Sequence, residues 1–322
     1  MHRSRTPHPR RAHSRILPEL ASRPILESFS DSGPVYRPST TPITARHLLT
    51  HTSGLGYYFL HPLLTKWANH AQRPPTNLVV EKYNYPLLFE PGEGWQYGCG
   101  LDWAGVAVAR ISGMNLEDYM IERIWKPVGR SAPFPTFHLS RHSEYKARLL
   151  QMVKRSNTGR LEPAELPVGD NPDDEEGGAG LTMTMRDFTA VLADLVSGDP
   201  KLLTPATISM AFEPQIPSSS PAIPMLKQLR PAWDMVSGPV PSESVNHGLL
   251  GLLLQGEAPE IKQPAGLMVW GGAANVLWFV GREEGVAGCF ATQVLPLGEQ
   301  RVKELANAWR RDFWGGWREG RA

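Results

Sequence analysis

The spacing of apolar residues changes twice along this chain, and these changes restrict the fold more than any other feature of the sequence. Across Thr44–Phe212, several stretches repeat apolar residues every three or four positions, as amphipathic helices do. Across Gly248–Val294, short apolar runs are bounded by Gly, Pro or charged residues, as antiparallel strands are. A final helical stretch follows at Glu299–Phe313. We therefore predict an α+β fold, in which an antiparallel sheet carries a C-terminal helix beside a mainly helical lobe.

The same patterns predict the individual elements. Helices are expected at residues 45–51, 103–111, 116–124, 183–195 and 204–212, and strands at 248–254, 267–269, 276–280 and 286–294. The helix at 103–111 should bury Ala104, Ala107, Val108 and Ile111, and the closing helix should bury Val302, Leu305, Ala306, Trp309 and Phe313. We assign no helix or strand to residues 16–42, 60–88 and 213–244, which are rich in Pro and polar residues.

Composition fits a globular protein of one large domain or two closely fused lobes. The 322 residues are 41% hydrophobic and 20% charged, and no apolar run reaches the roughly 18 residues of a membrane-spanning helix. Cys99 and Cys289 are too few for a disulfide framework, and the first residues do not resemble a secretory signal. We therefore expect a reducing, cytoplasmic location and no membrane partner.

The first fifteen residues differ in charge from the rest of the chain. They hold five of the 33 basic residues and no acid, so the remainder carries 28 basic against 32 acidic residues. A nucleic-acid-binding arm or an organellar transit peptide would show such a bias. Pro7 and Pro9 break an amphipathic helix there, so we favour a disordered head at 1–15 and expect no nucleic-acid partner. The domain itself is expected over 16–322, with a helical lobe at about 44–212 and a sheet lobe at about 245–315.

Three strings of sequence carry the functional information. Residues 43–55 read ITARHLLTHTSGL, residues 89–105 read FEPGEGWQYGCGLDWAG, and residues 270–275 read WGGAAN. Their order resembles that of serine hydrolases and acyltransferases of the β-lactamase/penicillin-binding-protein superfamily. The strings YGCGLDWAG and ATQVLPLG in particular resemble the fungal lovastatin-type transesterases, which acylate polyketide alcohols. This resemblance implies the same α+β fold and a two-step reaction, in which an acyl group passes from a thioester to a serine and then to an alcohol.

The resemblance also implies a nucleophile that these residues do not supply. In such families a Ser-x-x-Lys motif precedes the first string, on a helix where a three-residue spacing puts the hydroxyl and the amine on one face. No serine among residues 1–42 has a lysine three positions later. The single match, Ser143 with Lys146, follows the tyrosine string and stands among charged residues, so we do not assign it as the nucleophile. We expect the N-terminal helix and strands of the family fold to be incomplete here, and the nucleophile to lie outside this sequence.

Tyr97 is the residue to which the resemblance assigns proton transfer. It stands just before the helix predicted at 103–111, where the family carries the tyrosine of a Tyr-x-Asn-like motif that acts as general base. A phenol beside a lysine ammonium can be held as phenolate and accept a proton. The alternative is a tyrosine that only packs against Trp95 and Trp103. Cys99 replaces the asparagine of many relatives, which argues against β-lactam specialisation; Trp95 and Cys99 are candidate pocket-lining residues.

Trp270, Gly271 and Gly272 occupy the position of the Lys-Thr-Gly strand in penicillin-binding relatives. Glycine allows a substrate carbonyl to approach the strand, whose backbone amides can then serve as oxyanion donors. The resemblance implies that Trp-Gly-Gly is typical of the esterase and transesterase branch, and that the tryptophan shapes an apolar acyl pocket. The alternative is a tight strand entrance with no role in the chemistry.

No metal, nucleotide or other cofactor is expected. His47 and His51 have the four-residue spacing of a zinc pair, but Leu48 stands where a metalloprotease has Glu, and no third ligand follows at a recognisable distance. Ser53 is expected to bond to backbone within its turn. The glycines of residues 177–180 lack the Gly-Lys-Ser/Thr ending of a phosphate-binding loop.

Two functions remain open from the sequence. The first is an acyltransferase or esterase by descent, which transfers an acyl group from a thioester or ester to an alcohol in secondary metabolism, and which is inactive as written because the nucleophile is absent. Its partners would be a small-molecule acyl donor and an alcohol acceptor. The second is a noncatalytic protein that retains a binding cleft and associates with a small molecule or a partner enzyme.

Overall fold

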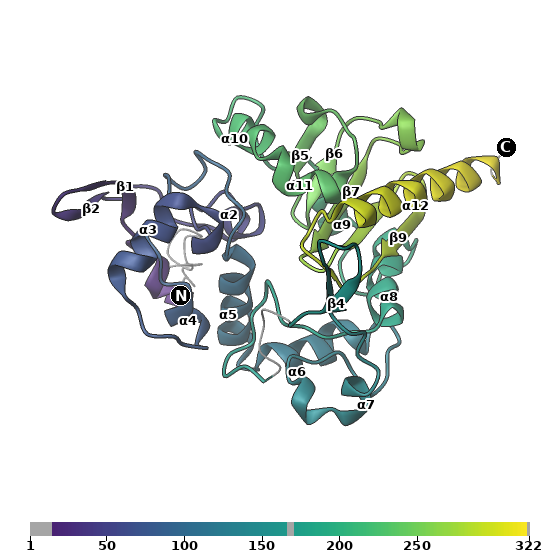
Figure 1. Cartoon of the computed structure of the whole chain (residues 1–322), viewed down its shortest axis with the longest axis horizontal. Coiled ribbons are helices and arrows are strands. Elements are labelled where there is room, and N and C mark those ends of the chain that lie inside the picture. Colours follow the sequence, from purple (N-terminus) through teal and green to yellow (C-terminus); the bar gives the residue numbers. More distant parts are fainter. Residues whose placement is uncertain (1–14, 166–170, 321–322) are drawn as a thin grey trace, which may run out of the picture. The chain divides into compact units, whose positions relative to one another are not determined.

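A computed structural model describes residues 15–165 and 171–320 (Figure 1). The predicted disordered head lies outside the described residues except for Arg15. The chain divides into two compact units, and each is described by itself. The first contains Met1–Tyr119, Pro172–Gly180 and Pro217–Leu226, and the second contains Met120–Asn171, Leu181–Ile216 and Lys227–Ala322. Both units include residues of the range 44–212.

The first unit is mainly helical and carries one antiparallel hairpin. Its elements are η1 (Pro18–Leu20), β1 (Ile25–Ser30), β2 (Gly33–Arg37), α2 (Ala45–Leu49), η2 (Tyr58–Leu60), α3 (Pro62–Ala71), α4 (Val79–Lys82), α5 (Gly100–Ser112) and the start of α6 (Leu116–Met120). The apolar core of this unit includes Leu26, Leu48, Leu55, Leu64, Leu87 and Trp103. Helix α10 (Ala222–Gln228) starts in this unit.

The second unit is built on a five-stranded antiparallel sheet with the strand order β5-β6-β7-β8-β9. Its strands are β5 (Val245–His247), β6 (Leu252–Leu254), β7 (Leu267–Gly272), β8 (Val276–Gly281) and β9 (Val286–Phe290). A smaller sheet has the order β10 (Val294–Leu295), β3 (Val153–Arg155), β4 (Leu161–Pro163). The helical segments are η3 (Ile121–Trp125, a π-helix), η4 (Leu139–Arg141), α7 (Ser143–Lys146), α8 (Met185–Val196), α9 (Pro205–Ala211), α11 (Arg230–Ser237), η5 (Ser242–Ser244), η6 (Pro259–Ile261) and α12 (Gln300–Glu319).

The predicted α+β class is confirmed by these elements. Helices α2, α5, α6, α8 and α9 and strands β6 to β9 lie where the sequence predicts helices and strands. The closing helix is also present, and in Figure 1 it lies along the five-stranded sheet. Among the described residues, no helix has the length and apolar character needed to cross a membrane.

The buried face of α12 was predicted wrongly in part. Leu305 is 57% exposed, whereas Val302, Ala306, Arg310 and Trp314 are buried at a regular four-residue spacing. The ring of Trp314 contacts Phe279 of β8 at a centroid distance of 4.9 Å. Arg310 belongs to this face because its Nη2 atom donates hydrogen bonds of 2.8 and 2.9 Å to the carbonyl oxygens of residues 235 and 236 in α11. A buried arginine of this kind satisfies backbone acceptors, and an apolar pattern does not reveal it.

The buried face of α5 was also predicted wrongly. The buried residues are Gly100, Asp102, Trp103 and Gly105, whereas Ile111 is 68% exposed. Helix α2 approaches the α5 backbone so closely that a Cβ atom added at Gly100 would lie 2.3 Å from the carbonyl oxygen of Leu48. A face built from two glycines, one carboxylate and a single tryptophan lacks the apolar periodicity on which the prediction relied.

The hairpin β1–β2 and helices α3, α10 and α11 fall in segments to which the sequence assigned no elements. Proline was read there as a helix breaker. In α3 and α11 it instead stands within the first two positions of the helix, where its missing N–H costs no hydrogen bond. The prolines therefore mark helix starts rather than irregular connections.

Candidate functional site

The first two sequence strings pack together in the first unit. The Gln96 amide donates a 3.0 Å hydrogen bond to the His51 carbonyl oxygen. A Cβ atom added at Gly98 would lie 2.4 Å from the carbonyl oxygen of Leu55, so only glycine permits this approach. The strings ITARHLLTHTSGL and GWQYGCG thus form one piece of structure around Tyr97.

Glu90 fixes the loop that leads to Tyr97. Its carboxylate is 6% exposed and accepts hydrogen bonds from the Thr40 and Thr41 amides and from Nη1 of Arg37. Burial by itself would raise the pKa of Glu90, but these hydrogen bonds outweigh it and lower the pKa to about 2. Glu90 is therefore ionised at neutral pH and holds its loop against residues 37–41.

Tyr97 lies in the turn before α5, half-buried among aromatic rings. Its ring meets His51 edge-on at a centroid distance of 4.9 Å and Tyr57 at 5.4 Å. Trp95 is 1% exposed and contacts His51 from another side, at 6.0 Å. Cys99 is fully buried in the core of the unit. Neither Trp95 nor Cys99 therefore offers appreciable surface to solvent.

Asp102 is a buried carboxylate that the sequence analysis did not single out. It is fully buried, and it accepts hydrogen bonds from the Tyr57 hydroxyl at 2.7 Å and from the Gly178 amide at 2.9 Å. Burial raises the pKa of Asp102 to about 6, although both hydrogen bonds oppose that change. The available signal was an acidic residue five positions after Tyr97, inside a helix that is otherwise largely apolar.

Glu176 is another buried carboxylate of the first unit. It is 8% exposed and accepts hydrogen bonds from Lys82 Nζ and from the Tyr83 hydroxyl. The Tyr83 ring meets the Tyr57 ring edge-on at 5.6 Å. Glu176 adds a second negative charge that acts on Asp102, and Lys82 supplies a partly compensating positive one. The glycine-rich string at residues 177–180 follows directly and brings the Gly178 amide to Asp102.

The surroundings of Tyr97 favour the protonated phenol. Burial and the negative charge of Asp102 raise the pKa of Tyr97 to about 12. At neutral pH this hydroxyl therefore carries its proton. A phenolate at that position would need a positive charge close to the phenol oxygen, of the kind that a neighbouring ammonium supplies.

In the second unit, residues 270–272 form the end of strand β7. Residues 267–269 pair with β6 on one side and residues 268–272 pair with β8 on the other. The β6 ladder ends opposite Val269, so Trp270, Gly271 and Gly272 extend beyond it. This arrangement leaves the Trp-Gly-Gly backbone outside the β6 ladder, which is what an oxyanion-binding strand requires.

The two glycines of this strand differ in their surroundings. A Cβ atom added at Gly271 would lie 2.4 Å from the Val276 carbonyl oxygen and 2.7 Å from Cγ1 of Val236. Gly272 is exposed, and its nearest such neighbour is Cβ of Val276 at 4.0 Å. Packing therefore explains glycine at 271 but not at 272. The Trp270 ring meets the buried His247 ring edge-on at 5.6 Å, and burial lowers the pKa of His247 to about 4.

The sequence also weighed Ser143 with Lys146, His47 and Ser53 as candidate site residues. Ser143 and Lys146 are both exposed on the four-residue helix α7. His47 completes the capping box of α2 with Thr44. The Ser53 hydroxyl accepts a hydrogen bond from the Leu55 amide at 3.3 Å, which confirms its predicted role within the turn.

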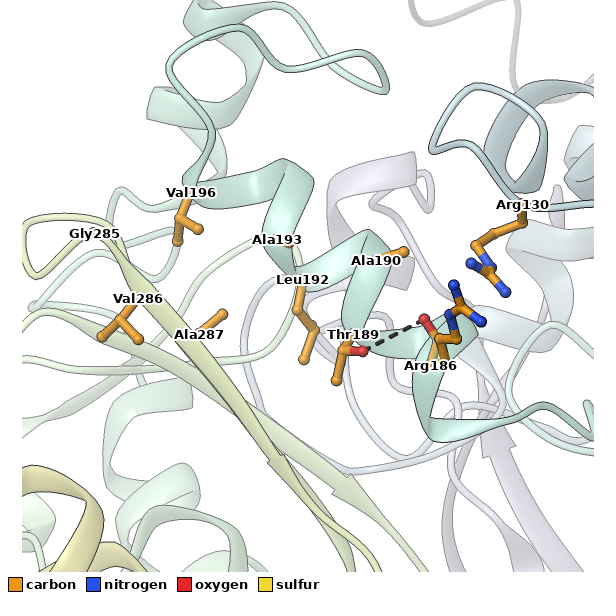
Figure 2. Close-up of a pocket in the computed structure, with 10 residues that line it drawn as sticks. All are labelled: Arg130, Arg186, Thr189, Ala190, Leu192, Ala193, Val196, Gly285, Val286 and Ala287. Carbon is orange, nitrogen blue, oxygen red and sulfur yellow. Dashed lines mark hydrogen bonds between the residues drawn. The ribbon is translucent and has the colours of Figure 1, made fainter.

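A groove of about 500 Å³ lies in the second unit beside helix α8 (Figure 2). The ten residues that line it include none of the residues that the sequence proposed for the chemistry. Tyr97 belongs to the first unit and Trp270–Gly272 to the second.

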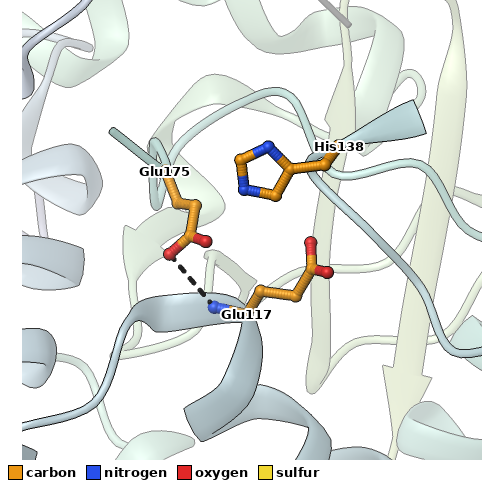
Figure 3. A group of neighbouring side chains, drawn as sticks. All are labelled: Glu117, His138 and Glu175. Carbon is orange, nitrogen blue, oxygen red and sulfur yellow. Dashed lines mark hydrogen bonds between the residues drawn. The ribbon is translucent and has the colours of Figure 1, made fainter. Parts of the chain in front are cut away.

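The acidic segment at residues 173–176 caps two helices of the first unit. Asp174 accepts a 3.0 Å hydrogen bond from the amide of Val79 at the start of α4. Glu175 accepts hydrogen bonds from the Leu116 and Glu117 amides at the start of α6, and Figure 3 shows the second of these. Carboxylates are favourable at helix N-termini because they satisfy free amides and oppose the helix dipole. His138, also drawn in Figure 3, belongs to the second unit.

Comparison with known proteins identifies the family. Residues 15–311 match the family described as Beta-lactamase. The chain belongs to this family. It is 53% identical to the acyltransferase calJ of Penicillium decumbens over 94% of this chain and 73% of that protein. It is 34% identical to the lovastatin esterase of Penicillium rubens over 94% of this chain and 77% of that protein. The resemblance found in the sequence strings is thereby confirmed.

Solved structures agree with this assignment. A mutant of simvastatin synthase from Aspergillus terreus superposes with a TM-score of 0.82 at 31% identity, over 95% of this chain and 76% of that one. EstCE1, described as a hydrolase with promiscuous acyltransferase activity, superposes with a TM-score of 0.66 at 20% identity, over 94% of this chain and 76% of that one. The β-lactamase-like α+β fold is therefore confirmed.

Proposed function

We propose that this protein is an acyltransferase or esterase of the β-lactamase family, which transfers an acyl group from a thioester or ester to an alcohol. The similarity to an acyltransferase at 53% identity and to a lovastatin esterase at 34% supports this reaction class. The observation that carries the proposal for this chain is the setting of Tyr97, a half-buried phenol at the end of a loop fixed by Glu90. A small-molecule acyl donor and a polyketide-like alcohol are the proposed substrates, and no cofactor is needed.

In the proposed reaction, Tyr97 exchanges protons with each hydroxyl that attacks or leaves the acyl carbon. A serine oxygen forms a bond to the carbonyl carbon, the thiol or alcohol of the donor leaves with a proton, and the acceptor alcohol then displaces the serine. A backbone amide of the strand end at residues 271 and 272 is the proposed donor to the oxyanion, and Trp270 is the proposed wall of the acyl pocket. An ammonium beside the phenol would lower the pKa of Tyr97 from about 12 and allow it to accept a proton.

A polypeptide of these 322 residues is proposed not to form an acyl-enzyme. Its one Ser-x-x-Lys match, Ser143 with Lys146, is exposed on a short helix, and no serine among residues 1–42 has a lysine three positions later. Without that lysine the phenol of Tyr97 stays protonated at neutral pH, and without that serine the acyl group has no acceptor oxygen of the proposed kind.

The test compares this polypeptide with a chimera that places the Ser-x-x-Lys segment of a family relative before residue 15. Both are incubated with a chromogenic butyrate ester and a fluorophosphonate probe. The chimera should hydrolyse the ester and take up the probe, and Tyr97→Phe should lower its kcat by roughly 10²- to 10⁴-fold. Labelling of the 322-residue polypeptide at a serine would overturn the proposed inactivity. A chimera whose rate is unchanged by Tyr97→Phe would overturn the role of Tyr97.

A noncatalytic binding protein is the second candidate. The protonated state of Tyr97 favours it, since a phenol with a pKa of about 12 can donate a hydrogen bond to a bound ligand without any reaction. A folded chimera that binds a polyketide alcohol in calorimetry, but shows neither ester turnover nor probe labelling, would support this function. Ester turnover by the chimera would favour the acyl-transfer function over this one.

A further inference from the structure

The groove in the second unit has apolar walls from two elements. Helix α8 contributes Ala190, Ala193 and Val196, and strand β9 contributes Val286 and Ala287 (Figure 2). Strand β9 is the last strand of the five-stranded sheet, so the groove runs beside a sheet edge. Its volume of about 500 Å³ falls within the range of roughly 300–1,000 Å³ that is usual for small-molecule sites.

Two arginines lie at one end of this groove. Figure 2 shows the guanidinium groups of Arg130 and Arg186 at that end, with Val196 and Val286 toward the other. None of the ten lining residues is acidic. The groove therefore combines an apolar length with a positively charged end.

Arg130 is held in place by a carboxylate outside the lining. Its Nε atom donates a 2.7 Å hydrogen bond to Oδ1 of Asp187, which is 3% exposed. The second oxygen of Asp187 accepts hydrogen bonds from the Thr184 hydroxyl at 2.6 Å and the Tyr145 hydroxyl at 3.0 Å. Asp187 thus accepts hydrogen bonds from Arg130, Thr184 and Tyr145 and fixes the position of Arg130. The charge of the exposed Arg186 is left for a ligand.

We propose that this groove binds an aliphatic carboxylate, with the carboxylate between Arg130 and Arg186 and the chain along α8 and β9. Guanidinium groups match a carboxylate through paired hydrogen bonds, and the charge of Arg186, which the Asp187–Arg130 pair leaves uncompensated, favours an anion. The alanine and valine side chains offer the chain an apolar surface without polar groups to desolvate. This binding does not depend on the proposed acyl transfer.

The experiment titrates the full 322-residue chain with sodium decanoate, below its micelle concentration, by isothermal calorimetry. We expect saturable binding of one decanoate, with affinity that falls roughly two- to fourfold for each methylene removed. Decanol, which lacks the charge, should bind at least about tenfold more weakly. Decanol affinity equal to that of decanoate, or binding only above the micelle concentration, would overturn the proposal.

Variants locate the site. Arg186→Gln should weaken decanoate binding about tenfold or more, since it removes charge-assisted hydrogen bonds. Ala193→Trp, at an exposed position of α8, should block the groove and abolish binding. Arg123→Gln is the matched control, because Arg123 is an exposed arginine of the same unit that does not line the groove. Unchanged binding in the first two variants would overturn the assignment, as would binding to anionic lipid vesicles without binding to monomeric decanoate.

Discussion

The Tyr57 hydroxyl donates a 2.7 Å hydrogen bond to Oδ2 of Asp102 inside the first unit. The Tyr57 ring also meets the Tyr97 ring edge-on at a centroid distance of 5.4 Å, so Tyr57 contacts both the carboxylate and Tyr97. The negative charge of Asp102 raises the pKa of Tyr97 in addition to the larger effect of burial. The protonation of the proposed catalytic phenol is therefore linked to a carboxylate that is fully buried.

Asp102→Asn should lower the pKa of Tyr97. The substitution removes a negative charge that disfavours phenolate and leaves the burial of Tyr97 unchanged. The measurement is NMR titration of the chain with ¹³C at the phenol carbons, with Tyr97→Phe to assign the resonance. Glu93→Gln is the control, since Glu93 is an exposed acid four positions before Tyr97. An unchanged Tyr97 midpoint in a folded Asp102→Asn variant would contradict the linkage.

The same carboxylate should make stability depend on pH. Because the pKa of Asp102 is raised to about 6 from an ordinary value of 3.8, the folded state binds the proton more tightly than the unfolded state does. The contribution of Asp102 to the free energy of unfolding is therefore most favourable below about pH 4. It falls by about 3 kcal/mol in total as the pH rises through about 6. Asparagine cannot ionise, so the stability of Asp102→Asn relative to the natural chain should increase over this window. Urea unfolding at several pH values measures it, and a difference that is constant with pH would show the pKa to be unshifted.

Tyr57→Phe should move that pH window upward. The Tyr57 hydroxyl donates a hydrogen bond that stabilises the charged form of Asp102. Its removal leaves the hydrogen bond from the Gly178 amide and raises the pKa of Asp102 above about 6. The midpoint of the pH-dependent stability should shift to higher pH relative to the natural chain. Tyr58→Phe, which changes an exposed neighbouring tyrosine, should leave the midpoint in place. A downward shift in Tyr57→Phe would contradict the assigned direction.

The sequence predicted strands β6 to β9 of the second unit because each of them lies in a short apolar run, whereas β5, with the sequence Val-Asn-His, lacks that pattern and was missed. It predicted α5 and α12 but not their whole buried faces, since Asp102 and Arg310 are buried by hydrogen bonds rather than by apolarity. The network of Asp102, Tyr57 and Glu176 joins residues up to 119 positions apart in the chain, between 57 and 176, and no local pattern contains that pairing. The motif strings located Tyr97, whereas its raised pKa comes first from burial and then from the charge of Asp102, and both required the fold.

Substitutions at Gly271 and Gly272 should separate packing from chemistry in the Trp-Gly-Gly strand. Gly271→Ala places a Cβ atom against the Val276 carbonyl oxygen and Val236, so it should lower the free energy of unfolding by about 1–3 kcal/mol. Gly272→Ala meets open space and should change stability by no more than about 0.5 kcal/mol. Urea unfolding of the two variants side by side measures this difference.

Gly272→Ala, which should barely change stability, should have a clear effect on the reaction. If the strand end admits a substrate carbonyl, a methyl group at position 272 obstructs it while the fold stays intact. In the chimera that carries Ser-x-x-Lys, Gly272→Ala should therefore lower ester hydrolysis at least about tenfold with little change in stability. Full activity in Gly272→Ala would leave the strand end with packing as its only role and would remove residues 271 and 272 from the proposed oxyanion donors.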